Sequence, residues 1–170
     1  MEILPYDREA AVLYARRWAF ARNPAYYNFD ALGGDCTNFA SQCLYAGTGV
    51  QNCTPVYGWY YQSVGERAPA WTGVPYFYQF LLGNAGRGGQ VIGEGQGPFA
   101  EQRSVFELEI GDFVQLGREN GEFYHTLIVV GFYRGVPLLA AHTNDAYNRP
   151  LTLWNYAKVR GLHILGVRTE

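Results

Sequence analysis

The sequence predicts an α+β domain in which N-terminal helices, one of them carrying a candidate nucleophile, pack on an antiparallel sheet. Up to about residue 47, apolar residues recur with helical spacing. After Pro98 the pattern changes to β-branched and aromatic runs separated by short glycine turns. Helices followed by a meander of strands are typical of an α+β architecture.

Two helices are expected in the first part of the chain. Asp7 precedes an amphipathic run over residues 8–20 and is a plausible N-cap, and Asn23-Pro24 ends that run. A loop over residues 25–34 leads to the second helix, which we expect to end at Ala46-Gly47.

The rest of the chain divides into a long excursion and a set of strands. Residues 48–97 are rich in Gly, Pro and aromatic side chains and contain one modest helical stretch, over 75–82. The strands are predicted from alternating or β-branched runs at 110–116, 123–132, 138–143 and 163–168.

Composition narrows the class of protein. A length of 170 residues, with 48% hydrophobic and 16% charged residues, predicts a single globular domain over residues 1–170. The net charge of −2 and the scattered basic residues argue against nucleic acid as the main partner. No apolar run is long enough to span a membrane.

The N-terminus and the cysteines bear on location. The N-terminus is acidic and broken by proline, unlike a signal peptide, and three irregularly spaced cysteines favour reduced thiols. We therefore expect a cytoplasmic location, unless the chain is a fragment of a secreted protein.

The candidate nucleophile is Cys36. It follows the pair Gly33-Gly34 and lies in or beside the first turn of the second helix, which Asp35 or Thr37 can cap. Unpaired backbone N–H groups and the positive end of the helix dipole favour a thiolate there. The sequence thus predicts a reactive cysteine that needs a base.

The candidate base is His125, early in the strand 123–132. A third group is expected to fix the tautomer of its imidazole, and the next strand offers His142 and Asn144. If the strand continues that far, both point to the same face, and either can accept the N–H of His125. The residues do not choose between them, and Asp145 is expected only to close a turn.

The remaining cysteines and histidine are expected to be structural. Cys43, two helical turns after Cys36, should pack in the core, and Cys53 lies in the loop region, where it can be exposed. His163 has no evident partner in the sequence. No spacing typical of a metal site joins the cysteines and histidines, so we expect no metal.

An oxyanion formed during attack needs two donors. The backbone N–H of Cys36 is the natural first donor, and Asn28 or a tyrosine of the preceding loop is a candidate second. The chain has 14 Tyr, 10 Phe and 4 Trp, most simply for an aromatic core. Within residues 56–80, Trp59 and Trp71 are candidates for a wall of the substrate cleft.

These residues occur in an order that resembles a known family. Tyr6-Asp7-Arg8, the run from Gly34 to Leu44, the run from Ile110 to Phe113, the run from His125 to Val129, and the run from His142 to Asp145 followed by Asn148-Arg149-Pro150-Leu151 are together similar to the bacterial putative amidase domain. The similarity covers nearly the whole chain, and residues 47–98 match least.

The resemblance implies a compact papain-like cysteine hydrolase fold, related to NlpC-type and CHAP cell-wall hydrolases. Cys36 would then match the nucleophile and His125 the base. The third member would match His142 in an NlpC-like pattern or Asn144 in a papain-like one. The papain-type Cys-Gly-Ser-Cys-Trp signature is absent, and no cell-wall-binding repeat accompanies the domain.

The function expected from these observations is hydrolysis of an amide or peptide bond through an acyl-enzyme on Cys36, without a cofactor. The substrate class is a small amide, a peptide or a peptidoglycan fragment. Two alternatives remain open: a catalytically silent module that binds a glycan or peptide, and an acyl transferase that uses the same cysteine.

Overall fold

The computed structural model describes residues 2–83, 85–86, 90–91 and 95–169. Residues 84, 87–89 and 92–94, part of the predicted excursion, lie outside this description. The helices of the described residues are α1 (Arg8–Trp18), α2 (Cys36–Thr48), α3 (Pro69–Thr72) and α4 (Val74–Leu82), with short 3₁₀ helices η1 (Val105–Glu107) and η2 (Leu151–Leu153). None of the described helices has the length and apolar character needed to cross a membrane.

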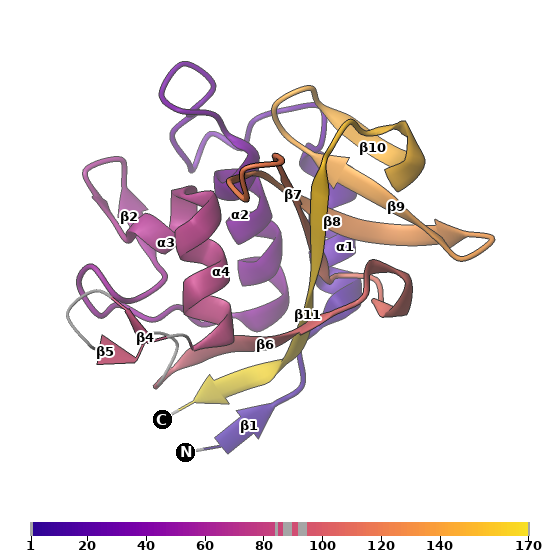
Figure 1. Cartoon of the computed structure of the whole chain (residues 1–170). Coiled ribbons are helices and arrows are strands. Elements are labelled where there is room, and N and C mark those ends of the chain that lie inside the picture. Colours follow the sequence, from indigo (N-terminus) through magenta and orange to yellow (C-terminus); the bar gives the residue numbers. More distant parts are fainter. Residues whose placement is uncertain (1, 84, 87–89, 92–94, 170) are drawn as a thin grey trace.

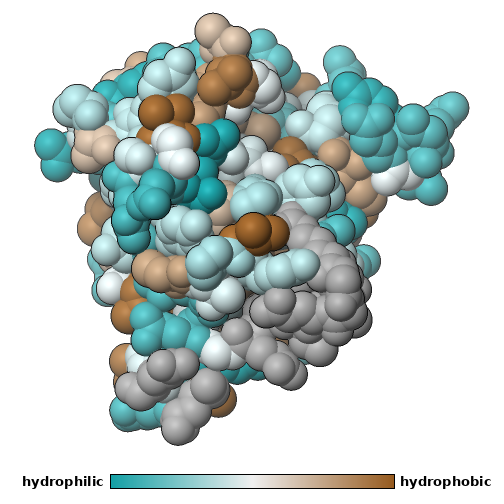
Figure 2. All heavy atoms as spheres, turned by 90° about the vertical axis from the view of Figure 1, so that its left-hand side faces the viewer, coloured by the Kyte–Doolittle hydropathy of each residue, from teal (hydrophilic) through white to brown (hydrophobic). Residues whose placement is uncertain are grey.

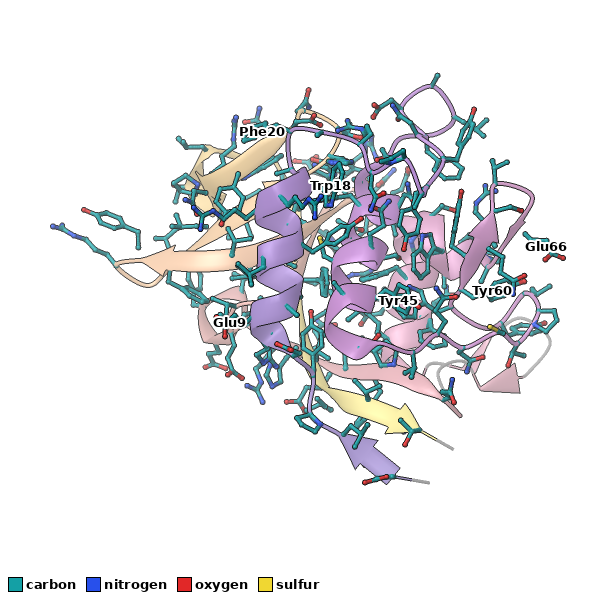
Figure 3. All side chains as sticks on the ribbon, turned by 180° about the vertical axis from the view of Figure 1, so that it is seen from behind. Glu9, Trp18, Phe20, Tyr45, Tyr60 and Glu66 are labelled. Atoms are coloured by element: carbon teal, nitrogen blue, oxygen red, sulfur yellow. The ribbon has the colours of Figure 1, made fainter. Side chains whose placement is uncertain are left out.

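Both predicted N-terminal helices are confirmed. The side chain of Asp7 accepts a hydrogen bond from the backbone N–H of Ala10 (3.0 Å) and caps α1 as expected. Helix α2 begins at Cys36 and ends slightly later than predicted, at Thr48, because Gly49 takes up the left-handed conformation that terminates it (φ 69°). The two helices run antiparallel, so the end of α1 at Trp18 lies beside the start of α2 (Figure 3).

The sheet is antiparallel and seven-stranded within the described residues. Its strand order is β1-β11-β7-β8-β9-β10, and β6 also pairs with β11. The long strands β8 and β11 run through it, and the two ends of the chain lie close together (Figure 1). The bounds are β1 (Glu2–Leu4), β6 (Gly97–Arg103), β7 (Phe113–Gly117), β8 (Phe123–Tyr133), β9 (Val136–Ala141), β10 (Ala146–Pro150) and β11 (Lys158–Thr169).

Strand β8 is buried on both faces. Ile128 packs into a cluster with Phe39 and Leu44 of α2. Leu127 and Val129 belong to a second cluster on the opposite face, under the η1 and η2 segments. Burial on both faces explains why this strand reads as a continuous apolar run rather than a clean alternation.

The aromatic excursion folds into the core. It contains α3 and α4 and two short hairpins: β2 (Tyr61–Ser63) with β3 (Glu66–Arg67), and β4 (Ala85–Gly86) with β5 (Gln90–Val91). Trp59 and Trp71 are fully buried, with ring centroids 4.7 Å apart and ring planes tilted by 30°, and their indole N–H groups donate to Ser41 and Asn38 of α2, respectively. The suggestion that they form a cleft wall is therefore wrong. The surface over this region mixes hydrophilic residues with small separate hydrophobic groups (Figure 2).

Candidate functional site

Cys36 is the first residue of α2 and is buried, with 8% of its surface exposed. Gly33 and Gly34 precede it with φ values of 86° and 101°, which favour glycine. The thiol lies 3.7 Å from the hydroxyl of Thr37, which in turn lies 3.0 Å from the hydroxyl of Thr126 on β8. The predicted place of the cysteine is thus confirmed.

The expected ionisation state of Cys36, a thiolate, is not confirmed. Burial raises the pKa of the Cys36 thiol above its ordinary value, despite hydrogen bonds from Thr126 and Thr37 that favour the thiolate. The nearby Asp35 carboxylate acts in the same direction as burial. In this structure the candidate nucleophile is therefore a thiol, and the start of the helix does not make it a thiolate.

His125 lies on β8, is 7% exposed, and has its ring beside that of Trp154 at 5.4 Å. Burial lowers the pKa of His125 to about 4. The imidazole is therefore neutral at physiological pH, which is the state a general base requires.

The backbone segments that carry Cys36 and His125 are neighbours in space, but the thiol and the imidazole do not contact each other. Alternation along β8 turns the Thr126 side chain toward α2, where its hydroxyl is 3.0 Å from that of Thr37. His125 then faces the other side of the sheet, with Trp154. Within the residues that the structure describes, no hydrogen bond joins the Cys36 thiol and the His125 ring.

His142 does not contact His125 either. Strand β9 ends at Ala141, so His142 lies in the following turn rather than on the strand as the prediction assumed. Its Nδ1 is 2.5 Å from a carboxylate oxygen of Asp35, and its Nε2 is 2.7 Å from the backbone carbonyl of Trp18. The ring also stacks on Phe39 at 4.0 Å. Both nitrogens are occupied, and neither is free to accept the N–H of His125.

The partners of His142 determine its charge. A carboxylate and a carbonyl are both acceptors, so both ring nitrogens donate and the side chain is an imidazolium. Burial alone would raise the pKa of Asp35, but hydrogen bonds from His142, Asn38 and the backbone of Phe29 hold it below its ordinary value. A buried ion pair thus lies directly before the candidate nucleophile, and it joins the end of α1, the start of α2 and the turn after β9.

The same turn carries two further contacts to the loop before α2. The hydroxyl of Thr143 accepts the backbone N–H of Asp35 (3.3 Å). Asp145 forms a two-point ion pair with Arg22, both distances being 3.0 Å, and Arg22 also pairs with Asp30. Asp145 therefore anchors the turn to the N-terminal loop, in addition to the turn-closing role predicted for it.

Asn144 is the residue of this turn that reaches the surroundings of His125. Both line a surface hollow of about 400 Å³. Asn144 has a positive φ of 59°, a conformation that asparagine tolerates better than most residues. Of the two candidates for a third group, the structure brings Asn144 to the hollow beside His125 and His142 to Asp35.

The remaining predicted residues divide clearly. Cys43 is fully buried and Cys53 exposed, as predicted. The absence of a partner for His163 was wrong, because its Nδ1 lies 2.8 Å from the buried carboxylate of Asp112. Asn28, the candidate second oxyanion donor, uses its side-chain oxygen to accept the backbone N–H of Asp30 (2.9 Å).

The functional environment that sequence reasoning missed is Asp35 and the hollow. Asp35 was expected as a helix cap, yet its side chain makes no capping hydrogen bond and bonds His142, Asn38 and Phe29 instead. The sequence did contain a signal for the hollow. The motif Asn148-Arg149-Pro150-Leu151, which supplies Arg149 to its lining, follows the His142 turn directly in the resemblance to the amidase family.

Comparison with known proteins agrees with the family resemblance of the sequence motifs. The family model described as Putative amidase domain matches residues 5–165. The chain is 36% identical over 156 residues to the uncharacterized protein YhbB of Bacillus subtilis (strain 168), covering 89% of this chain and 45% of that protein. It thus spans about half the length of the curated relative it matches, and no solved structure matches it. Since the family model covers nearly all of the described fold, the chain belongs to the Putative amidase domain family, whose name indicates amide hydrolysis.

Proposed function

We propose that this domain has a papain-like fold and hydrolyses an amide bond with Cys36 as nucleophile and His125 as general base. The observation that carries the proposal is the hydrogen bond between the hydroxyls of Thr37 and Thr126 (3.0 Å). It brings the start of α2 to the residue that directly follows His125. A nucleophile at a helix start beside a histidine-bearing strand is the arrangement used by cysteine hydrolases.

The reaction begins from a neutral pair. Because Thr126 and His125 share a peptide bond, the contact between Thr37 and Thr126 brings the backbone of His125 near the start of α2. The proposal requires the imidazole to leave Trp154 and move to the side of β8 that faces Cys36, where it takes the thiol proton as sulfur attacks the substrate carbonyl. The C–S bond forms, the imidazolium gives its proton to the leaving amine as the C–N bond breaks, and water then hydrolyses the thioester.

Two further groups complete the proposed site. The backbone N–H of Cys36, at the start of a helix, is suited to stabilise the oxyanion. Asn144, which lines the same hollow as His125, is assigned to orient the imidazole once it has turned. His142, with both nitrogens bound, is assigned to hold Asp35 and thereby the first turn of α2.

The test measures release of primary amines from soluble peptidoglycan fragments and from N-acetylated peptides. We expect activity in the wild type and in the matched control Cys53→Ala, which changes the exposed cysteine. Cys36→Ala should abolish activity, and His125→Gln should reduce it by about 10²–10⁴-fold, the usual contribution of a general base. Activity that survives Cys36→Ala contradicts the proposal.

The same experiment separates the alternatives. A silent binding module would bind the fragments and release no amine. An acyl transferase would release the leaving amine faster when a second amine is added, and the acyl group would appear on that amine. Mass spectrometry of the products distinguishes this outcome from the free acid that hydrolysis produces.

A further inference from the structure

The hollow beside His125 has a chemical character of its own. It measures about 400 Å³, toward the lower end of the range for small-molecule sites. Strand β8, the turn after β9, strand β10 and the segment around η2 all contribute to it. Its lining residues are Leu116, Tyr124, His125, Asn144, Arg149, Leu153, Trp154 and Asn155.

The charged side chain that lines the hollow is positive. Arg149 is the permanently charged residue among those that line it, and none of them is acidic. The acidic residues nearest in sequence are engaged elsewhere, Asp145 with Arg22 and Glu122 with Arg118. A negative group entering the hollow therefore meets a cation and no carboxylate of the lining.

Arg149 is held in place but keeps free donors. One of its terminal nitrogens donates to the backbone carbonyl of Leu153 (2.7 Å), and the guanidinium lies over the Trp154 ring at 4.9 Å. A guanidinium has five N–H donors, so several remain for a ligand, in the fork geometry that suits a carboxylate.

The backbone around Arg149 is irregular. The pairing of β10 with β9 shifts register between Ala146 and Arg149, and Asn148 has a φ of 58°. Such bulges redirect side chains and are frequent next to functional sites. Asn148 belongs to a residue type that tolerates this conformation.

Trp154 adds a second feature to the same wall. The indole N–H of Trp154 is buried and has no hydrogen-bond partner among the described residues. Buried donors are nearly always paired, and an unpaired one calls for an explanation. Because the ring of Trp154 lines the hollow, the signal of this N–H reports a ligand that enters beside the ring.

We propose that this hollow is the substrate-binding subsite and that Arg149 binds a carboxylate of the substrate. The inference rests on the proposed function for its connection to catalysis, since His125 and Asn144 line the same hollow. It narrows the substrate class from amides in general to amides of molecules that carry a free carboxylate near the scissile bond, such as a peptide with its C-terminal acid.

The test uses the Trp154 indole N–H as a reporter in NMR titrations of the Cys36→Ala protein, with Trp154→Phe to assign its signal. The probes are N-acetylalanine and its uncharged amide. We expect the acid to shift the signal saturably and the amide to bind at least tenfold more weakly. Arg149→Gln should abolish this preference, whereas Arg149→Lys should retain part of it.

The matched control is Arg134→Gln. Arg134 is likewise placed beside an aromatic ring, that of Tyr133, but it lies in the turn between β8 and β9 and does not line the hollow. It should leave the preference unchanged. The other indole signals report whether each variant is folded.

Equal binding of the two probes, no binding of either, or an unchanged preference in Arg149→Gln would overturn the inference. Because Cys36→Ala needs no catalysis to bind, failure here is distinguishable from failure of the proposed function. If the acid binds through Arg149 but the wild type cleaves no amide, the hydrolase proposal fails and the carboxylate site remains.

Discussion

Replacing His142 by Phe separates a structural role from a catalytic one. The substitution keeps an aromatic ring to stack on Phe39 but removes both hydrogen bonds. The Asp35 carboxylate, 1% exposed, loses its nearest cationic partner and keeps only Arg22, whose Nε lies 3.6 Å away, and the carbonyl of Trp18 loses a donor. Breaking one side of a buried ion pair costs about 3–5 kcal/mol. Since a domain of this size has about 5–15 kcal/mol of total stability, the loss is large.

The assay is urea unfolding followed by circular dichroism at pH 7, on four proteins: wild type, His142→Phe, Asp35→Asn and the double variant. Asp35→Asn removes the buried charge that His142→Phe leaves with Arg22 as its cationic partner. The double variant should therefore be more stable than the sum of the single losses predicts, by about 2 kcal/mol, within the range measured for residues in contact.

The reasoning is refuted if His142→Phe unfolds within about 0.5 kcal/mol of the wild type, the scale of an ordinary surface change. If that variant keeps its stability but loses amide hydrolysis, His142 acts in catalysis, as the NlpC-like pattern implies. If stability and amide hydrolysis fall together in His142→Phe, and the double variant recovers stability without activity, the Asp35–His142 pair is needed to fix the start of α2.

Three other predictions follow from burial and close packing. With iodoacetamide at pH 7.5, the exposed Cys53 should be alkylated well before Cys36, because burial raises the pKa of the Cys36 thiol and restricts access to it. Mass spectrometry of digests gives the order of labelling. Faster labelling of Cys36 would show that it is a thiolate instead. Because the pKa of His125 falls to about 4 on folding, the unfolded state binds the extra proton between about pH 6.5 and 4, so this residue should cost stability progressively as the pH falls through that window, by about 3 kcal/mol in total. Comparing the urea stability of wild type and His125→Gln across that range isolates this contribution, and parallel curves would contradict it. Gly47→Ala should destabilise the protein by more than about 3 kcal/mol, because the added Cβ would lie 2.3 Å from a ring carbon of Tyr6 and 2.7 Å from a backbone oxygen, and a thermal melt close to that of wild type would contradict this packing.

Patterns within short windows of the sequence predicted the helix caps, helix starts and strands that local interactions determine. The cap at Asp7, the start of α2 at Cys36 and the strand around Leu127 each follow from spacing or residue type within a short window. Strand β6 was missed because it is held by pairing with β11, some sixty residues further along the chain, rather than by its own alternation. No short window contains that information.

The candidate site shows the same division. Cys36 and His125 were predictable because each has the residue type and the element position that its chemistry needs. The partner of His142 was not, because the choice among Asp35, His125 and solvent depends on where β9 ends. One or two residues of strand length decide which side of the sheet a following side chain reaches.

The neutral state of Cys36 and His125 bears on how the proposed site would work. A preformed thiolate–imidazolium pair would be reactive toward any electrophile that reached it, whereas the raised pKa of Cys36 and the lowered pKa of His125 keep the proton on sulfur. In the proposed mechanism, attack then requires the imidazole to leave Trp154 and approach the thiol. A ligand in the hollow that contacts Trp154 and Arg149 acts on the same wall that holds the ring, so binding and activation share residues. We therefore expect occupancy of the hollow by N-acetylalanine to change the rate of Cys36 alkylation in wild type, and to leave it unchanged in Arg149→Gln.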